Sequence, residues 1–213
     1  MLRIAIIVFA FMLLPFRVQA KEITLVKSGK TAYTIIVASD ASPSELHAAR
    51  ELQDFVAQMS GAQMPILTDA YPLPEKAVVL GENRWSQTLV PDLNVKELAK
   101  EGYIQKTVGE HLVITGGKPR GTLFGVYGIL EDHLGCRWFT PDCSRIPKSK
   151  TIVLSELDER IIPRLEYRDP FYSDGFDGDW VLRNRMNSSR AAGVESKGGK
   201  VQFSDLAFCH TFF

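Results

Sequence analysis

The chain has 213 residues, of which 45% are hydrophobic and 23% are charged, and its 25 basic residues balance its 25 acidic residues. This balance gives no electrostatic reason to expect nucleic acid or an acidic membrane surface as a partner, because both require a concentrated basic face. Three cysteines are too few for a disulfide scaffold. The composition favours a globular protein with one full domain and part of a second.

Residues 1–20 have the pattern of a cleavable signal peptide. A basic start precedes an apolar run over residues 4–14, and small residues lead to an expected cut after Ala20. A membrane anchor is the alternative, but the apolar run is shorter than the roughly 20 residues of a spanning helix, and Pro15 interrupts it. We predict a mature chain that begins at Lys21 and is secreted or periplasmic, with no membrane segment after signal removal.

Two strands and a long helix are predicted next. Residues 22–26 and 33–38 are strand-like on either side of a Ser-Gly-Lys turn, and the second is so continuously apolar that it should be an interior strand. Ser42 and Glu45 have the spacing of a capping box, with a proline between them at the first helical position. This helix should extend to about Ser60.

The helix that starts after Ser42 has an apolar stripe and a polar side. The stripe is Leu46, Ala49, Leu52, Val56 and Met59, whereas Arg50, Glu51, Gln53 and Asp54 are expected mostly on the solvent side.

Short apolar runs predict further strands at residues 64–67, 77–80, 103–108, 111–115 and 152–154. Gly109 and Glu110 separate two of these runs and have the chemistry of a hairpin turn. Residues 82–100 read as a loop with a short helix over 95–100.

A second helix is predicted over residues 120–134. Leu123, Tyr127, Leu130 and Leu134 form one apolar stripe, and Gly121, Gly125 and Gly128 form another. Because glycine inside a helix costs up to about 1 kcal/mol relative to alanine, we expect the glycine stripe to approach a sheet closely. Gly135 is expected in a left-handed cap. The elements to residue 158 therefore predict an α+β domain, a small mixed sheet with two amphipathic helices on one face.

The pattern changes after residue 159. A strand over 166–171, a Gly/Asp loop over 173–179 and a helix over 180–186 would together form one βα unit. Such a unit cannot bury its faces alone, and parallel sheets need several of them. We therefore predict an accessory domain over residues 21–158, and over residues 159–213 the start of an incomplete TIM-barrel-like domain, from a chain that is truncated.

Two motifs resemble a known family. The run from Ala48 to Phe55, AARELQDF, with the MSGA that follows, is similar to the first helix of the N-terminal domain of α-glucuronidases and β-N-acetylhexosaminidases. The run from Arg120 to Gly128, RGTLFGVYG, with the later GCRWFTP, is similar to the second helix of that domain and its turn. The chain most resembles secreted bacterial proteins that join this domain to an uncharacterised TIM-barrel-like domain of glycoside-hydrolase type.

The resemblance implies an accessory role. In those families the catalytic carboxylates lie on later barrel strands, so it implies that this chain holds no catalytic residue and needs the missing catalytic barrel as its partner. We therefore predict the noncatalytic N-terminal part of an exported glycoside hydrolase that acts on polysaccharide-derived glycosides of uronic or N-acetylated sugars. Two alternatives stay open: a noncatalytic glycan-binding or assembly module, and a truncated pseudogene product.

One concentration of polar and aromatic residues is a candidate substrate-binding site for carbohydrate. A tryptophan can stack on a sugar face, and arginine can hold a uronic carboxylate through two hydrogen bonds. The alternative is that the arginines pair with nearby aspartates and the tryptophan packs beneath its helix. The candidates are Arg168, Asp169, Trp180, Arg183, Asn184 and His210.

Other groups give weaker signals. Glu131 and Asp132 are adjacent on a helix and diverge, so a solvated face explains them better than a catalytic pair. Lys118 and Arg120 lack a phosphate-loop pattern and are interpreted as basic side chains on the surface of a turn. The acidic loop over 173–179 does not match a calcium loop. We predict neither a cofactor nor a metal, and leave open whether Cys136 and Cys143 form a disulfide.

Overall fold

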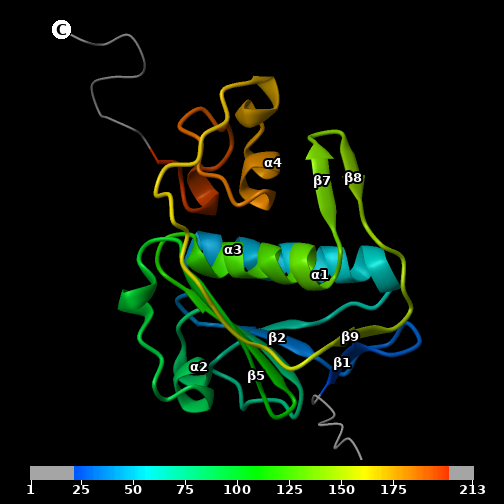
Figure 1. Cartoon of the computed structure of the whole chain (residues 1–213). Helices are drawn as coiled ribbons and strands as arrows, with labels where there is room; N and C mark the ends of the chain where they lie inside the picture. The colour runs from blue at the N-terminus through cyan, green and yellow to red at the C-terminus, as the bar shows by residue number, and fades with distance from the viewer. Residues whose placement is uncertain (1–21, 202–213) are drawn as a thin grey trace, which may run out of the picture.

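The computed structural model describes residues 22–201, which form a six-stranded mixed sheet with two helices packed on one face (Figure 1). Across the sheet the strands are β10 (Asp158–Ile161), β5 (Tyr103–Val108), β6 (His111–Gly116), β4 (Ala77–Leu80), β2 (Thr34–Val37) and β3 (Ile66–Thr68). Strands β6, β4, β2 and β3 are parallel, and β5 and β10 join them in antiparallel pairing. The predicted α+β class is confirmed, as is the interior position of β2.

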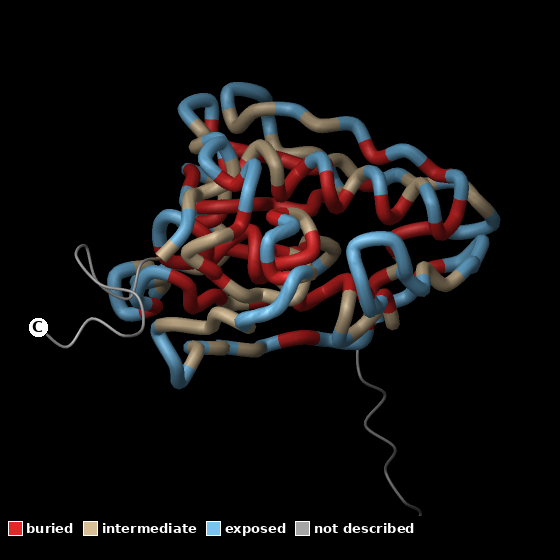
Figure 2. The backbone as a smooth tube through the Cα atoms, turned by 90° about the horizontal axis from the view of Figure 1, so that it is seen from above, coloured by how far each residue is buried: buried red, intermediate tan, exposed pale blue. Residues whose placement is uncertain are grey.

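Helices α1 (Pro43–Ser60) and α3 (Gly121–Gly128) cover the same face of the sheet. The Ser42 hydroxyl accepts from the Glu45 amide and the Glu45 carboxylate accepts from the Ser42 amide, which confirms the capping box. Gly61 ends α1 with a φ of 86°. Apolar side chains of both helices and of the sheet form the main core, and Figure 2 shows these buried stretches through the middle of the molecule.

The second predicted helix is only partly regular. The α-helical geometry ends at Gly128, and a π-helical turn, η2 (Ile129–His133), follows it. A continuous α-helix to residue 134 was therefore wrong. Its apolar stripe is nevertheless buried at Leu123, Tyr127 and Leu130, so the spacing alone could not distinguish the two geometries. Gly135 has the expected left-handed conformation, with a φ of 77°.

The glycine stripe of α3 faces the sheet, as predicted. A β carbon on Gly125 would lie 2.6 Å from Cγ2 of Ile114, and one on Gly128 would lie 2.6 Å from Nε2 of Gln105. The Gln105 side chain donates to the Gly125 carbonyl at 2.8 Å. The missing side chains thus allow the helix backbone to approach β5 and β6 closely.

The elements between α1 and α3 agree in part with those predicted from the sequence. The hairpin of β5 and β6 is confirmed, with Val108 opposite His111. The short helix predicted near residue 95 is a 3₁₀ turn, η1 (Val95–Leu98). Helix α2 (Arg84–Leu89) lies within a predicted loop, and the Asn83 side chain caps it by accepting from two backbone amides.

Strands β1 (Ile23–Val26) and β9 (Ile152–Leu154) do not join the main sheet, contrary to expectation. They pair with each other antiparallel as a separate ribbon. The main sheet instead gains β10 at its edge, which crosses the predicted domain boundary at residue 158. After α3 the chain forms a projecting hairpin of β7 (Arg137–Thr140) and β8 (Cys143–Arg145), where a simple turn was expected (Figure 1).

Residues 162–201, called here the C-terminal segment, lie over the outer side of α1 and α3 (Figure 1). They contain η3 (Ser173–Phe176), α4 (Gly178–Arg183) and η4 (Glu195–Lys197). The strand predicted over residues 166–171 is absent, because no neighbouring strand lies beside it in the described part of the chain. No closed barrel is present within residues 22–201.

Candidate functional site

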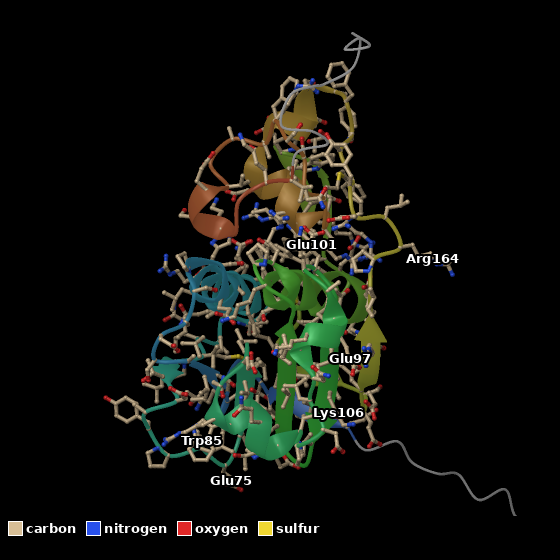
Figure 3. The ribbon with its side chains drawn as sticks, turned by 90° about the vertical axis from the view of Figure 1, so that its left-hand side faces the viewer. Glu75, Trp85, Glu97, Glu101, Lys106 and Arg164 are labelled. Carbon is tan, nitrogen blue, oxygen red and sulfur yellow. The ribbon has the colours of Figure 1, made fainter. Side chains whose placement is uncertain are left out.

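Three arginines of the C-terminal segment reach carboxylates of the α/β unit beneath it. We call this contact region the junction. Its ion pairs are Arg168 with Glu101, Arg183 with Glu51, and Arg185 with both Glu131 and Asp132. Four of the six predicted site residues, Arg168, Trp180, Arg183 and Asn184, make contacts across it. Figure 3 shows Glu101 at the level where the two parts meet.

Glu101 is the most enclosed carboxylate of the junction, with 6% of its surface exposed. It lies in the loop between η1 and β5. Arg120 donates to its Oε1 from Nε at 2.8 Å, and Arg168 pairs with its Oε2. The amide nitrogen of Asn187 donates to the same Oε2 at 3.0 Å. Both carboxylate oxygens are therefore occupied by donors from two distant parts of the chain.

Arg120 is buried, with 2% of its surface exposed, contrary to the surface position that the sequence suggested. Besides Glu101 it binds the carbonyl of Gly198 at 3.0 Å, which ties the start of α3 to the C-terminal segment. Its carboxylate partner is supplied by a loop with no motif of its own, and sequence spacing carries no sign of it. Lys118, by contrast, is exposed as expected.

Glu51 is the second carboxylate on which contacts of the junction converge, although it was expected mostly on the solvent side of α1. It is 7% exposed and accepts from Nε of Arg183 at 3.0 Å and from Nη2 at 3.1 Å. The Tyr127 hydroxyl also donates to it, at 2.9 Å. Burial and the neighbouring Glu51 raise the pKa of Tyr127 well above its usual value, so Tyr127 remains a proton donor.

Arg183 and Arg185 keep their charges despite partial burial. Burial lowers the pKa of Arg183, but its hydrogen bonds to Glu51 raise it more, and Asp132 does the same for Arg185. Arg185 has a φ of 55°, an uncommon conformation for a residue with a side chain. From there its guanidinium reaches Asp132 at 2.6 Å and Glu131 at 2.5 Å.

The other predicted site residues that the structure describes also form hydrogen bonds within the protein. The Trp180 indole is 4% exposed and donates to the Trp138 carbonyl at 3.1 Å, and Asn184 donates to the same carbonyl at 3.2 Å. Asp169 accepts from the Ser189 hydroxyl at 3.0 Å within the C-terminal segment. His210 lies outside the described residues. The arginines therefore pair with carboxylates of the α/β unit, and not with the nearby aspartates of their own segment.

Two hollows adjoin the junction. One of about 450 Å³ lies beside Glu101, Arg164 and Leu165, and another of about 360 Å³ is lined partly by Tyr103, Asn184 and Arg185. Both hollows touch Arg168, the only predicted site residue common to them. Sugar binding by the predicted residues stays a prediction.

The described residues 22–201 contain no group of three or more His, Cys, Asp or Glu side chains placed to hold a metal ion. No helix in this range is long and apolar enough to cross a membrane. Cys136 and Cys143 are both free thiols. Two aspartates of the acidic loop over residues 173–179 have partners within the protein. Asp177 caps α4, and Asp179 pairs with Lys197.

The geometry of the junction suits attachment better than acid-base chemistry. Glycoside hydrolysis needs a protonated acid and a second carboxyl group about 5 to 9.5 Å away across the sugar. Here Glu51, Glu101 and Glu131 are each held by an arginine. The junction therefore holds two parts of the chain in a fixed relation.

Comparison with known proteins identifies the α/β unit. The family described as "Glycosyl hydrolase family 67 N-terminus" matches residues 17–129, more than half of the chain. No curated protein sequence matches.

Among solved structures, a family GH115 4-O-methyl-α-glucuronidase with specificity for decorated arabinogalactans superposes with a TM-score of 0.56 at 14% identity. The match covers 84% of this chain but 29% of that one. A β-hexosaminidase of Streptomyces plicatus gives a TM-score of 0.41 at 17% identity, over 71% of this chain and 25% of that one. The chain thus spans less than a third of the length of these structures.

Proposed function

Because the chain belongs to the family of glycosyl hydrolase family 67 N-terminal domains, we propose that it is the noncatalytic N-terminal part of an exported glycoside hydrolase. The expected substrates are polysaccharide-derived glycosides of uronic or N-acetylated sugars. The observation that carries this proposal is the family match over the α/β unit, together with the predicted glycine-rich helix that the structure places against the sheet.

The junction supports a positioning role for the same unit. A catalytic domain that followed the C-terminal segment would be anchored to α1 and α3 through Arg168, Arg183 and Arg185. Buried and bidentate ion pairs fix an orientation better than exposed single contacts, because each guanidinium has one planar geometry to satisfy. We propose that the accessory domain predicted over residues 21–158 extends to Ile161, because β10 completes its sheet, and that the C-terminal segment begins the catalytic domain.

Export rests on the pattern of residues 1–20, which lie outside the described part of the chain. Expression of the full chain in a bacterial host with an intact export system should yield a periplasmic form whose N-terminal residue is Lys21. N-terminal sequencing of that form is the measurement. Retention of Met1 on a cytoplasmic product would contradict export.

The test of function compares the chain alone with a longer protein. The 213-residue chain should not release the aryl group from aryl α-glucuronides or aryl N-acetyl-β-hexosaminides. A protein in which a family catalytic barrel is fused after Phe213 should release it from at least one of them. A control fusion with Glu101→Gln and Glu51→Gln should lose activity through misplacement, without a change in the barrel itself. Inactivity of the unaltered fusion on both substrate classes would contradict the proposal.

A further inference from the structure

An exposed aromatic and cationic surface lies on the far side of the molecule from the junction. It consists of the exposed Tyr71 and Arg84 and the half-buried Trp85, from the loop after β3 and the start of α2, and we call it the platform. Figure 3 shows Trp85 near the lower end of the molecule, whereas Glu101 lies near mid-height, below the C-terminal segment. Tyr71 is 57% exposed, which is high for a residue in an ordered loop. Nothing in the proposed function uses these residues.

The three platform residues are fixed to one another through a single backbone group. The Tyr71 carbonyl accepts from Nη2 of Arg84 at 2.8 Å and from Nε1 of Trp85 at 3.2 Å. The Arg84 guanidinium also stacks on the Trp85 ring, with 4.3 Å from Cζ to the ring centroid. Such a stack on an indole holds the cation in place without neutralising its charge.

The loop that carries Tyr71 is also restrained. Pro72 follows it directly and fixes one backbone torsion, and the Tyr71 amide donates to the Thr68 carbonyl at 3.3 Å. Asp69 accepts from both the amide and the hydroxyl of Ser39, at 2.9 and 2.7 Å. A loop whose backbone is already ordered loses little conformational entropy when a ligand binds, so even a small contact area can give measurable affinity.

The Arg84 guanidinium is exposed and can still form an ion pair with a ligand. Within residues 22–201 no carboxylate lies within ion-pair distance of its guanidinium. The Asp69 carboxylate is held by Ser39, whose hydrogen bond lowers its pKa. The backbone and the charge of Arg84 lower it further, so Asp69 offsets part of the Arg84 charge without forming an ion pair. An exposed guanidinium bound to the backbone of an exposed tyrosine is complementary to a planar carboxylate attached to a ring with an apolar face.

We propose that the platform binds an acidic oligosaccharide through a uronic acid residue. The uronate carboxylate pairs with the Arg84 guanidinium, and the sugar ring stacks on the Tyr71 side chain. The site would hold a polysaccharide chain at a distance from any catalytic domain attached through the junction. It goes beyond the proposed function and does not depend on it, because binding here requires no hydrolysis.

The test measures binding of tetragalacturonate to the full chain by calorimetry and by tryptophan fluorescence. Trp138 and Trp180 are buried, so a change in emission and in acrylamide quenching reports chiefly on Trp85. The matched control ligand is the same tetrasaccharide with its carboxylates methyl-esterified, which removes charge and keeps the ring. We expect the ester to bind at least about tenfold more weakly, the loss that follows from about 1.4 kcal/mol of a charge-assisted contact.

Substitutions of Arg84 and Tyr71 test whether these residues bind the ligand. Arg84→Gln and Tyr71→Ala should each weaken binding of the charged ligand at least about tenfold, and Arg84→Gln should not weaken binding of the ester further. The control variants Lys96→Gln and Phe139→Ala remove an exposed cation and an aromatic ring that is 58% exposed, and should bind as the parent does. Circular dichroism would show that each variant is folded.

The outcomes separate this proposal from the proposed function. Absence of tetragalacturonate binding at millimolar concentration, or unchanged binding by both Arg84→Gln and Tyr71→Ala, would overturn the platform. Neither result bears on whether a fusion with a catalytic barrel cleaves aryl glycosides. Conversely, an inactive fusion would leave the binding measurement intact.

Discussion

Glu51 of α1 and Arg183 at the end of α4 form a two-point ion pair, with nitrogen–oxygen distances of 3.0 and 3.1 Å between residues 132 positions apart. The pair joins the helix layer of a family 67 N-terminal domain to the segment that follows it. Tyr127 of α3 donates to the same carboxylate, so three elements converge on one side chain. The position of the C-terminal segment depends on these buried polar contacts as well as on apolar packing.

Replacement of Glu51 should therefore be costly. Glu51→Gln keeps the shape but leaves Arg183 without its counter-charge, and we expect the free energy of unfolding to fall by about 2 to 3 kcal/mol. Urea denaturation followed by tryptophan fluorescence measures it. The control is Glu97→Gln, which breaks an exposed pair with Arg160 and should cost no more than about 1 kcal/mol. Equal losses in the two variants would contradict a special role for Glu51.

Glu101→Gln should loosen the C-terminal segment more than it affects the sheet. Arg120 and Arg168 would both lose their anion, and Arg120 is too buried to be solvated in compensation. We expect limited proteolysis to cut within residues 162–201 at least several-fold faster, while the fragment that ends near Ile161 persists. Glu166→Gln, at an exposed pair with Lys100, is the matched control. Uniform protection in Glu101→Gln would show that the segment is held by other contacts.

Substitution of Gly125 tests the contact between α3 and the sheet. Gly125→Leu should destabilise the α/β unit by about 1 to 3 kcal/mol, because its side chain would overlap Ile114 and Tyr103. Gly125→Ala should cost less, since only one carbon must be accommodated. Gly109→Asn is a control at a left-handed turn position, where a β carbon meets no atom within 4 Å. Unchanged stability of Gly125→Leu would mean that the stripe does not face the sheet.

Stability should depend on pH near neutrality through His47 on α1. Burial lowers the pKa of His47 below its usual value; Glu51 and Asp179 oppose this shift, whereas Lys197 and Arg183 add to it. Because the folded pKa is below the unfolded one, the unfolded state binds more protons between them, and stability falls as pH drops through that window. The free energy of unfolding should decrease from about pH 7 to about pH 5.

His47→Gln separates this effect from that of the acidic groups. The variant should show a weaker decrease between those two pH values. Burial raises the pKa of Asp179, but its hydrogen bond to Lys197 lowers it more, so the Asp179 contribution is lost only at more acidic pH. Denaturation curves of parent and variant at several pH values are the measurement. Parallel pH profiles would rule out His47 as the group responsible.

Local patterns predicted most of the α/β unit. The capping box at Ser42, the hairpin turn at Gly109 and the glycine stripe of α3 depend on residues close in sequence, and the structure confirms all three. Strand pairing was harder, because β1 and β9 are separated by more than 120 residues and nothing in either run specifies its partner.

The junction could be predicted only in part. Arg168 and Arg183 were recognised as an unusual concentration of charge, but Glu51 was expected mostly on the solvent side of its helix and Glu101 belongs to no predicted element. A polar residue on a helix is normally interpreted as exposed unless another element packs over it. Here Arg183, which packs over Glu51, follows it by 132 residues. The aspartates that lie nearer in sequence were the expected partners, and the fold brings the glutamates instead.

Glycoside cleavage by the purified chain of 213 residues tests most directly whether this chain lacks catalytic residues. It should be incubated with aryl α-glucuronides, aryl N-acetyl-β-hexosaminides and reducing polysaccharides that carry uronic acids. We expect release no faster than in the buffer control, because a noncatalytic domain supplies no acid and nucleophile pair. Turnover that scales with chain concentration and is lost in Glu101→Gln or Glu51→Gln would contradict it.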